Sequence, residues 1–351
     1  MAIDKKFIDQ FVKVSTRAAL ASHYLVGKKD KIAADKAAVD AMRSELNKID
    51  MNGQVVIGEG TLDEAPLLYT GEFLGTKKGP DFDIAVDPVE GTNFVANNLP
   101  GGIAVLAIGE KLGTMNGPEL DIAVDPLEGT NFAANNLPGA LSVIAIGEKS
   151  NLFNAPETYM EKIATSKIAK GVIDLDQTVK KNILNLCEFK NKSPDQLTAC
   201  VMDRPRHKKI IDELKDLKVN LKLITDGDVS GALLVSNDKY KVDIFLGIGG
   251  GPEGVLAASA LDAMGCFFQG RFLFETENDK NRAKNMGIED FNKKYELNEI
   301  ISGDSIFCAT GITSGELVQG IKLENKKFYS ETLVTHKSSG FNEVISLEQS
   351  I

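Results

Sequence analysis

A ten-residue segment occurs twice in the chain, as DIAVDPVEGT over residues 83–92 and as DIAVDPLEGT over residues 121–130. The flanking residues repeat as well, so that residues 71–111 (copy 1) and 109–149 (copy 2) are two versions of one unit, offset by 38 residues. Each copy predicts a buried strand, a tight turn that opens a helix, and a second buried strand, VLAIGEK or VIAIGEK. Two copies are too few for a solenoid.

Each copy places two carboxylates and a hydroxyl after its first apolar run. They are Asp87, Glu90 and Thr92 in copy 1, and Asp125, Glu128 and Thr130 in copy 2. Two carboxylates three residues apart can reach one hard divalent cation, which prefers oxygen ligands. The backbone N–H groups of the following turn suit a phosphate. The segment therefore indicates metal-assisted phosphoryl hydrolysis, although a single D-P-x-E sequence also fits an ordinary strand end at which Asp caps a helix.

The composition narrows the class of protein. A chain of 351 residues allows one large or two medium domains with a sizeable core. The formal net charge of −10 argues against a nucleic-acid or membrane partner, so an anionic substrate needs a local basic cluster or a metal. No apolar run approaches the length of a membrane span. Four separate cysteines and a start without a signal sequence predict a reducing, cytoplasmic location.

Two more carboxylates upstream of the repeat are candidate ligands. Asp35 lies in a predicted amphipathic helix over residues 28–49, where most Asp side chains are simply solvated. Glu59 stands between Gly58 and Gly60 at the end of a short predicted strand. Glycines at such a position allow the backbone to approach a ligand closely. The alternative for Glu59 is an ordinary turn residue.

The second half of the chain predicts an α/β domain. We place a boundary near Gly171, between an N-terminal metal-binding domain (residues 1–170) and a C-terminal substrate-binding domain (residues 171–351). Beyond the boundary a strand, a loop and a helix follow one another three times, which predicts a mostly parallel sheet with a site at its strand ends. Residues 277–299 are predicted as a polar helical stretch before a last strand, IFCATG.

The loops of this second domain carry polar side chains that suit a phosphorylated sugar. Arg204 and Arg206, with His207 as a candidate third member, form a basic cluster, and arginine binds phosphate through two parallel hydrogen bonds. Asp226 and Asp228 could accept hydrogen bonds from sugar hydroxyls or bind a metal. The alternative for the basic cluster is a solvated surface patch.

The segment GIGGGPEG is the other candidate in this domain. It lacks the spacing of a dinucleotide-binding fingerprint. Its glycines let the backbone approach a phosphate, and Glu253 supplies a carboxylate at its end. The alternative is simple packing of a strand against a helix.

Taken as a whole, the chain resembles the class II fructose-1,6-bisphosphatases, within the wider fold that includes the inositol monophosphatases. The resemblance covers nearly the whole chain and rests on these blocks in order: KKDKIAADKAAVDAMR, VIGEG, DEAP, DIAVDPxEGT, NAPETYMEKI, RPRH, DGD, GIGGGPEG, FCATGIT and ETL. It implies a layered α/β/α/β/α sandwich, made of two halves with the active site between them.

The resemblance also implies roles for individual residues. The implied divalent-metal ligands are Asp35, Glu59, Asp87 or Asp125, Glu90 or Glu128, and Glu253. The implied activator of the attacking water is the turn threonine, Thr92 or Thr130. The implied contacts to a sugar bisphosphate are Gly129, Tyr159, Arg204, Arg206, Asp226, Asp228 and Gly250. Ligands made only of oxygen favour Mn²⁺ or Mg²⁺ over zinc.

The activity implied by the resemblance is hydrolysis of the 1-phosphate of fructose 1,6-bisphosphate to give fructose 6-phosphate, a step of gluconeogenesis. One alternative is a sedoheptulose-1,7-bisphosphatase or an enzyme for both substrates. An alternative of another class is an inactive sugar-phosphate-binding protein, disabled by the internal duplication. By the same resemblance we expect a homo-oligomer.

The chain departs from the family pattern in two respects. Thr61 stands where the family usually has a second acidic residue after G-E-G, which leaves the number or affinity of the metal ions open. The duplication is foreign to the family, so we expect one copy in the site and the other displaced. We favour copy 2, because its second strand leads directly to Tyr159, and because copy 1 has Gly102 where copy 2 has Ala140. A displaced copy should lower stability or alter assembly, unless its strands find a sheet edge.

Overall fold

The structure is a computed structural model. It describes residues 6–26, 31–58, 72–78, 81–86, 107–108, 120–128, 141–148, 153, 155–156, 158–168, 171–225, 227–285 and 287–350. Side chains are described for most but not all of these residues.

The elements are numbered in chain order. The helices are α1 (Lys6–His23), α2 (Lys31–Leu46), α5 (Val179–Lys190), α6 (Lys208–Asp216), α7 (Asp228–Leu233), α8 (Gly251–Ala263), α9 (Glu277–Asn285) and α10 (Leu297–Ile300), with short 3-10 turns η1 (Pro194–Gln196), η2 (Pro205–His207), η3 (Leu234–Ser236) and η4 (Asp238–Tyr240). The strands are β1 (Asn52–Gly58), β2 (Phe73–Leu74), β3 (Asp81–Val86), β4 (Ala107–Ile108), β5 (Leu120–Glu128), β6 (Leu141–Glu148), β7 (Tyr159–Thr165), β8 (Thr198–Met202), β9 (Asn220–Ile224), β10 (Ile244–Gly250), β11 (Phe267–Leu273), β12 (Lys294–Glu296), β13 (Ser305–Gly311), β14 (Lys322–Glu324), β15 (Lys327–His336) and β16 (Phe341–Ser350).

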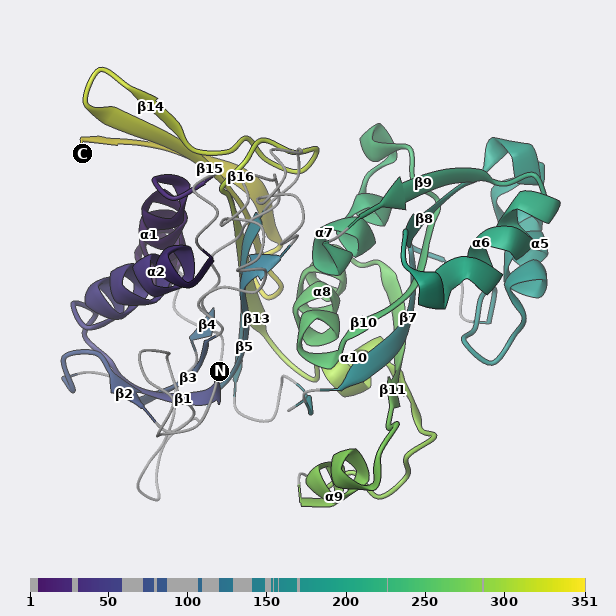
Figure 1. The fold of residues 1–351 in the computed structure, drawn as a ribbon, viewed down its shortest axis with the longest axis horizontal. Helices are drawn as coiled ribbons and strands as arrows, with labels where there is room; N and C mark the ends of the chain where they lie inside the picture. The colour runs from purple at the N-terminus through teal and green to yellow at the C-terminus, as the bar shows by residue number, and fades with distance from the viewer. Residues whose placement is uncertain are drawn as a thin grey trace.

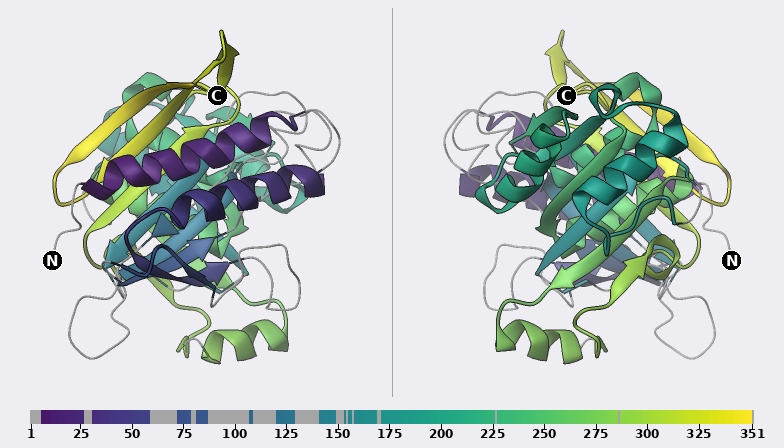
Figure 2. Two further views of the ribbon diagram at one scale, coloured as in Figure 1. Left: turned by 90° about the vertical axis from the view of Figure 1, so that its left-hand side faces the viewer. Right: turned by 90° about the vertical axis from the view of Figure 1, so that its right-hand side faces the viewer.

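These elements form five layers (Figure 1). Helices α1 and α2 cover one side of a layer of strands that contains β5, β6, β13 and β15, and they lie side by side across it (Figure 2). Helices α7 and α8 fill the middle layer. Beyond them lies a second sheet, which α5 and α6 cover on its outer side. The α/β/α/β/α sandwich predicted from the sequence is therefore confirmed.

Helix α8 packs between the two layers of strands and contacts both. It contacts β5, β6 and β13 on one side and β7, β10 and β11 on the other. Nearly every residue from Gly254 to Leu261 is an apolar or small residue, and all of them are buried. A helix that is apolar all round must be covered on all sides. Its sequence therefore requires a sheet on both of its faces.

The second sheet is mixed rather than mostly parallel. Its order is β12-β11-β7-β10-β8-β9. Strands β10, β8 and β9 run parallel, as predicted, but β7 pairs antiparallel with both β10 and β11, and β11 with β12. The prediction was wrong because β7 enters this sheet from the N-terminal half of the chain. It lies in the centre, between strands that follow it in sequence.

The sheets do not divide at the predicted boundary near Gly171. Strand β7 precedes this point and lies in the second sheet, whereas β13 follows it and pairs with β6. The residues after β13 add three more strands, β14 to β16, where only a tail was expected. The predicted helical stretch over residues 277–299 is also corrected, because α9 ends at Asn285 and strand β12 follows.

The two copies of the repeat pair with different neighbours. In copy 1, β3 pairs in parallel with β1 and antiparallel with β4. In copy 2, β5 pairs antiparallel with β6, which in turn pairs with β13. Copy 1 thus has the strand that precedes the repeat as its neighbour, and copy 2 has a strand that follows it. The two copies meet where β3 contacts β5.

The acidic segment of copy 2 is extended where a tight turn was predicted. Strand β5 continues to Glu128, and its register with β6 shifts between Asp125 and Glu128. Pro126 lies within this irregularity. Proline has no N–H to give to the ladder, and it is tolerated in strands at such irregular positions.

None of the helices in the described part of the chain combines the length and the apolar character that a membrane span requires.

Candidate active site

Three of the predicted substrate contacts lie together at one end of the second sheet. Tyr159 begins β7 and is directly opposite Gly250, the last residue of β10. The guanidinium of Arg206 lies over the Tyr159 ring, 4.9 Å from its centroid. Its Nε donates a 2.9 Å hydrogen bond to the carbonyl oxygen of Ile248. A planar cation stacked on an exposed aromatic ring is held in place without losing its other donors.

Arg204 is close by in sequence, at the start of the same turn. It caps η2, whose second and third residues are Arg206 and His207. Pro205 begins this turn, and its fixed φ angle favours such a start. The basic cluster thus follows β8 directly, at the edge of the sheet where β10 also ends.

His207 is not a member of the basic cluster, contrary to the prediction. Its side chain is fully buried. The ring Nδ1 lies 2.8 Å from the carbonyl oxygen of Met202, and Nε2 accepts a 2.7 Å hydrogen bond from the backbone N–H of Ile248. These partners require a neutral ring that donates from Nδ1. Burial, together with the positive charges of the two arginines, lowers the pKa of His207 below its ordinary value. The ring instead ties η2 to β10.

Glu253 lies in the first turn of α8, immediately beyond this strand end. Gly250 caps the helix, and the N–H of Gly251 donates a 2.8 Å hydrogen bond to the carbonyl oxygen of Thr158. The carboxylate folds back over Gly250, where any Cβ atom would overlap Oε2 of Glu253. This Oε2 atom is buried and has no hydrogen-bond partner among the described residues. An acid is also favoured in the first turn by the helix dipole.

The environment of Glu253 fits a divalent cation. Buried carboxylate oxygens almost always have a partner, so one without a hydrogen bond needs an explanation. A hard cation such as Mn²⁺ or Mg²⁺ prefers such an oxygen. Within the described residues, no three His, Cys, Asp or Glu side chains lie close enough together to hold a metal. Among the implied ligands, Glu253 is the one whose side chain lies in the described part of the structure.

The other predicted ligands and contacts are only partly covered by the structure. Asp35 lies in α2, and Asp125 and Glu128 lie in β5, but their side chains are outside the described part. The remaining predicted residues lie outside the described residues altogether: Glu59, Asp87, Glu90, Thr92, Gly129, Thr130 and Asp226. Gly58 and Val86, which directly precede Glu59 and Asp87 in the sequence, are paired in parallel strands.

Asp228 has a partner that the sequence analysis missed. Its carboxylate forms an ion pair with Nζ of Lys162, and both side chains are buried, at 6% and 1% exposure. Lys162 lies on β7 on the same face as the buried residues Met160 and Ala164. A charged residue in an apolar position of an alternating strand is a signal that could have been noticed.

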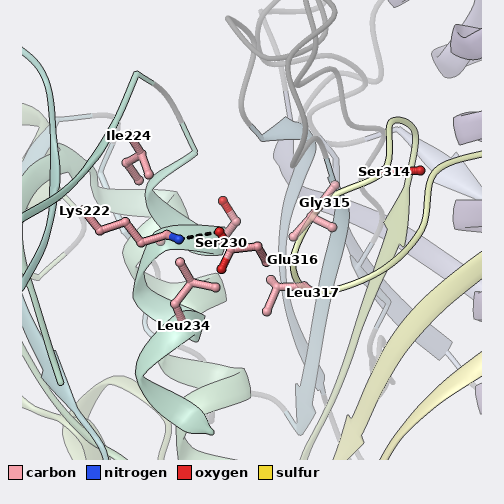
Figure 3. Close-up of a pocket in the computed structure, with 10 residues that line it drawn as sticks. Lys222, Ile224, Ser230, Leu234, Ser314, Gly315, Glu316 and Leu317 are labelled. Carbon is pink, nitrogen blue, oxygen red and sulfur yellow. Dashed lines mark hydrogen bonds and ion pairs between the residues drawn. The ribbon is translucent and has the colours of Figure 1, made fainter. Parts of the chain in front are cut away.

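A cavity of about 340 Å³ lies between the two halves (Figure 3). Ser230 and Leu234 line it from the middle layer, and the loop before β14 lines it from the other side with Glu316 and Leu317. Lys222 also lines it and forms an ion pair with Glu316. Most of the lining is apolar, and the positive charge of Lys222 is already paired with Glu316. The cavity is therefore a poor match for the phosphates of a sugar bisphosphate.

Comparison with known proteins shows similarity over almost the whole chain. The family model described as "Bacterial fructose-1,6-bisphosphatase, glpX-encoded" matches residues 5–112 and 106–349. A protein of Synechococcus sp. (strain JA-3-3Ab) named D-fructose 1,6-bisphosphatase class 2/sedoheptulose 1,7-bisphosphatase is 37% identical over 96% of this chain and 93% of its own length. Proteins of the same name from Trichodesmium erythraeum (strain IMS101) and Prochlorococcus marinus (strain AS9601) are each 36% identical, over 94% and 95% of this chain and 92% of their own length.

The neutral state of His207 predicts a specific pH dependence of stability. Its pKa is lowered on folding from 6.5, so below about pH 6.5 the unfolded chain binds a proton that the folded protein does not. We expect the melting temperature of the wild type to fall between about pH 7.5 and pH 5.5 by roughly 1–3 °C more than that of His207→Gln. Both proteins keep every other titrating group. Parallel pH profiles would contradict the burial of a neutral ring.

Proposed function

The chain belongs to the family of bacterial, glpX-encoded fructose-1,6-bisphosphatases, and we propose that it removes the 1-phosphate of fructose 1,6-bisphosphate to give fructose 6-phosphate. This makes it a phosphoric monoester hydrolase. The observation that carries the proposal is the buried Oε2 of Glu253, which has no hydrogen-bond partner among the described residues and lies beside Gly250, at the strand end that also holds Tyr159 and Arg206.

We assign the described residues complementary roles. Glu253 holds Mn²⁺ or Mg²⁺ together with Asp35, Glu59 and the carboxylates of the repeated segment. The cation, when bound, supplies positive charge beside the phosphoryl oxygens and lowers the pKa of the attacking water. Arg204 and Arg206 bind the phosphate that does not react, and so orient the other phosphate toward the carboxylates.

The remaining predicted contacts complete the site. Tyr159 and Gly250 border the sugar, Asp226 and Asp228 belong to the loop beside it, and the turn threonine orients the water. In copy 2 the turn threonine is Thr130, and Gly129 before it is the predicted substrate contact.

The sedoheptulose 1,7-bisphosphate activity is a second candidate, because the names of the relatives include both substrates. Assay of both bisphosphates with Mn²⁺ or Mg²⁺ tests the assignment. Turnover of neither, with binding of either, would instead support a sugar-phosphate-binding protein disabled by the duplication.

We further propose a cytoplasmic homo-oligomer acting in gluconeogenesis. The four cysteines are buried free thiols, which suits a reducing compartment. The expectation of an oligomer comes from the resemblance to the family, and sedimentation velocity would test it.

The role of Glu253 can be tested by removing its charge. We expect Glu253→Gln to lower kcat by about 100-fold or more, since a metal ligand is lost. The metal-free variant should melt within roughly 2 °C of the wild type, because the change also relieves a buried carboxylate. Addition of Mn²⁺ should raise the melting temperature of the wild type only.

A matched control for this test lies on the same helix. Asp262, near the other end of α8, forms a 2.6 Å ion pair with Lys337. Asp262→Asn removes the same charge and should leave kcat and the Mn²⁺ response unchanged. Activity of Glu253→Gln near the wild-type level at saturating Mn²⁺ would exclude Glu253 as a ligand.

The basic cluster predicts a change in KM rather than in kcat. We expect Arg204→Ala/Arg206→Ala to raise KM for fructose 1,6-bisphosphate at least about tenfold, with kcat within about threefold, because a bond to the non-reacting phosphate is kept from ground state to transition state. Lys208→Ala/Lys209→Ala removes two positive charges from the adjacent exposed positions and should not change KM. An unchanged KM in the arginine variant would make the cluster a surface feature.

We propose that copy 2 supplies the carboxylates of the repeated segment. Helix α8, which carries Glu253, contacts β5 and β6 of copy 2. The contrary observation is the parallel pairing of β1 with β3, since Glu59 follows β1 and Asp87 follows β3 in the sequence.

Two double variants decide between the copies. We expect Asp125→Asn/Glu128→Gln to lose activity by about 100-fold or more, and Asp87→Asn/Glu90→Gln to keep it within about threefold. Each variant is the control for the other, because the substitutions and the charge change are the same. Loss only in the copy 1 variant would reverse the assignment. Equal loss in both would mean that both copies contribute.

A further inference from the structure

Lys162 is a buried lysine that none of the roles above uses. Its side chain is 1% exposed. On β7 it stands opposite Gly247 of β10 on one side and Gly270 of β11 on the other. Two cross-strand neighbours without side chains leave room for a long one. Burying an ammonium group is unfavourable unless its partners compensate well.

The partner of Lys162 begins helix α7. Nζ of Lys162 contacts Oδ2 of Asp228, the first residue of that helix. The chain reaches Asp228 through Gly227, which has a φ of 83° and so adopts the left-handed conformation that favours glycine. Asp226 directly precedes this glycine. The ion pair therefore fixes the end of the loop that is proposed to face the sugar.

The same ion pair lies against the end of β10 and the first turn of α8, the turn that carries Glu253. Any Cβ atom on Gly249 would overlap Oδ2 of Asp228. A Cβ atom on Gly254, the residue after Glu253, would lie 3.1 Å from Cε of Lys162. Lys162 and Asp228 thus fill the space between the start of α7 and the first turn of α8.

We propose that Lys162 is a positioning residue for the phosphatase reaction. Its ion pair with Asp228 sets the separation between the start of α7, at Gly227 and Asp228, and the turn that presents Glu253 to the metal. Asp228 then influences the substrate through the placement of its neighbours, while its Oδ2 atom binds Lys162. This inference rests on the proposed function, because it uses the metal and sugar roles of those two segments.

A purely structural role for the ion pair gives a different result. It would change stability alone, whereas positioning also changes the binding of metal and substrate. We expect Lys162→Met to raise the dissociation constant for Mn²⁺, followed by the electron paramagnetic resonance signal of free Mn²⁺, by about 10-fold or more. KM for fructose 1,6-bisphosphate should rise as well, at a temperature where the variant is fully folded.

The neighbouring strand β10 provides a matched control. Asp243 immediately precedes β10, at the opposite end from Gly250. It is buried and pairs with Lys190 at 2.9 Å and Lys192 at 2.8 Å. We expect Asp243→Asn to lower the melting temperature while both binding constants stay within about twofold of the wild type, as for sites that share no partners.

A double variant separates position from stability. Lys162→Met/Asp228→Leu replaces the buried ion pair by apolar groups, which commonly restores stability. We expect its melting temperature to recover but its Mn²⁺ and substrate constants to remain weakened. Recovery of all three, or wild-type constants in Lys162→Met, would overturn the inference.

Two further measurements make the test independent of folding and of the proposed activity. If Lys162→Met does not fold, Asp228→Asn keeps the size of the side chain and removes its charge, and it should weaken both constants in the same way; unchanged constants would overturn the inference. A wild type that does not hydrolyse fructose 1,6-bisphosphate would contradict the proposed function, whereas the Mn²⁺ constants would still test the positioning role.

Discussion

The burial of helix α8 is the constraint on which the arrangement of this protein depends. Because the helix is apolar on all sides, it is stable only with a sheet on each face, and this brings the two halves of the chain together. Its N-terminal turn then emerges where β7 begins and β10 ends. That turn holds Glu253, Gly250 caps it, and Arg206 and Tyr159 stack beside it. One packing requirement thus places an acidic side chain and a basic one, from distant parts of the sequence, at the same edge.

Glycines at this edge allow charged side chains to be buried close to the backbone. The carboxylates of Glu253 and Asp228 occupy the positions that Cβ atoms would take at Gly250 and Gly249. The segment GIGGGPEG therefore has two uses, since it ends a strand and makes room for two acids. Simple packing of a strand against a helix would explain the apolar part of α8 but not the placement of these carboxylates.

Much of the fold could be predicted from the sequence, because the blocks of the chain carry local signals. The helix predicted over residues 28–49 is present as α2, and the predicted strand IFCATG is present as β13, because each has a local pattern of its own. What could not be predicted is which strands become neighbours. The neutral state of His207 follows from a hydrogen bond that its Nε2 accepts from the N–H of Ile248, 41 residues away. The role of Lys162 follows from an ion pair with Asp228, 66 residues away. Nothing local distinguishes such a histidine from a member of a basic cluster. The same reason explains why the antiparallel position of β7 was missed.

The pairing of β1 with β3 rather than with β5 has a consequence for how the chain folds. Strands β3 and β5 share the sequence DIAV, so their side chains do not decide which of them pairs with β1. In the unfolded chain, β1 must close a much longer loop to reach β5 than to reach β3. The difference in closure entropy is only about 1 kcal/mol, because this term grows with the logarithm of loop length. We therefore expect the nearer strand to be captured first in most molecules, and the farther one in a minority. The duplication therefore offers β1 two alternative partners of the same sequence during folding.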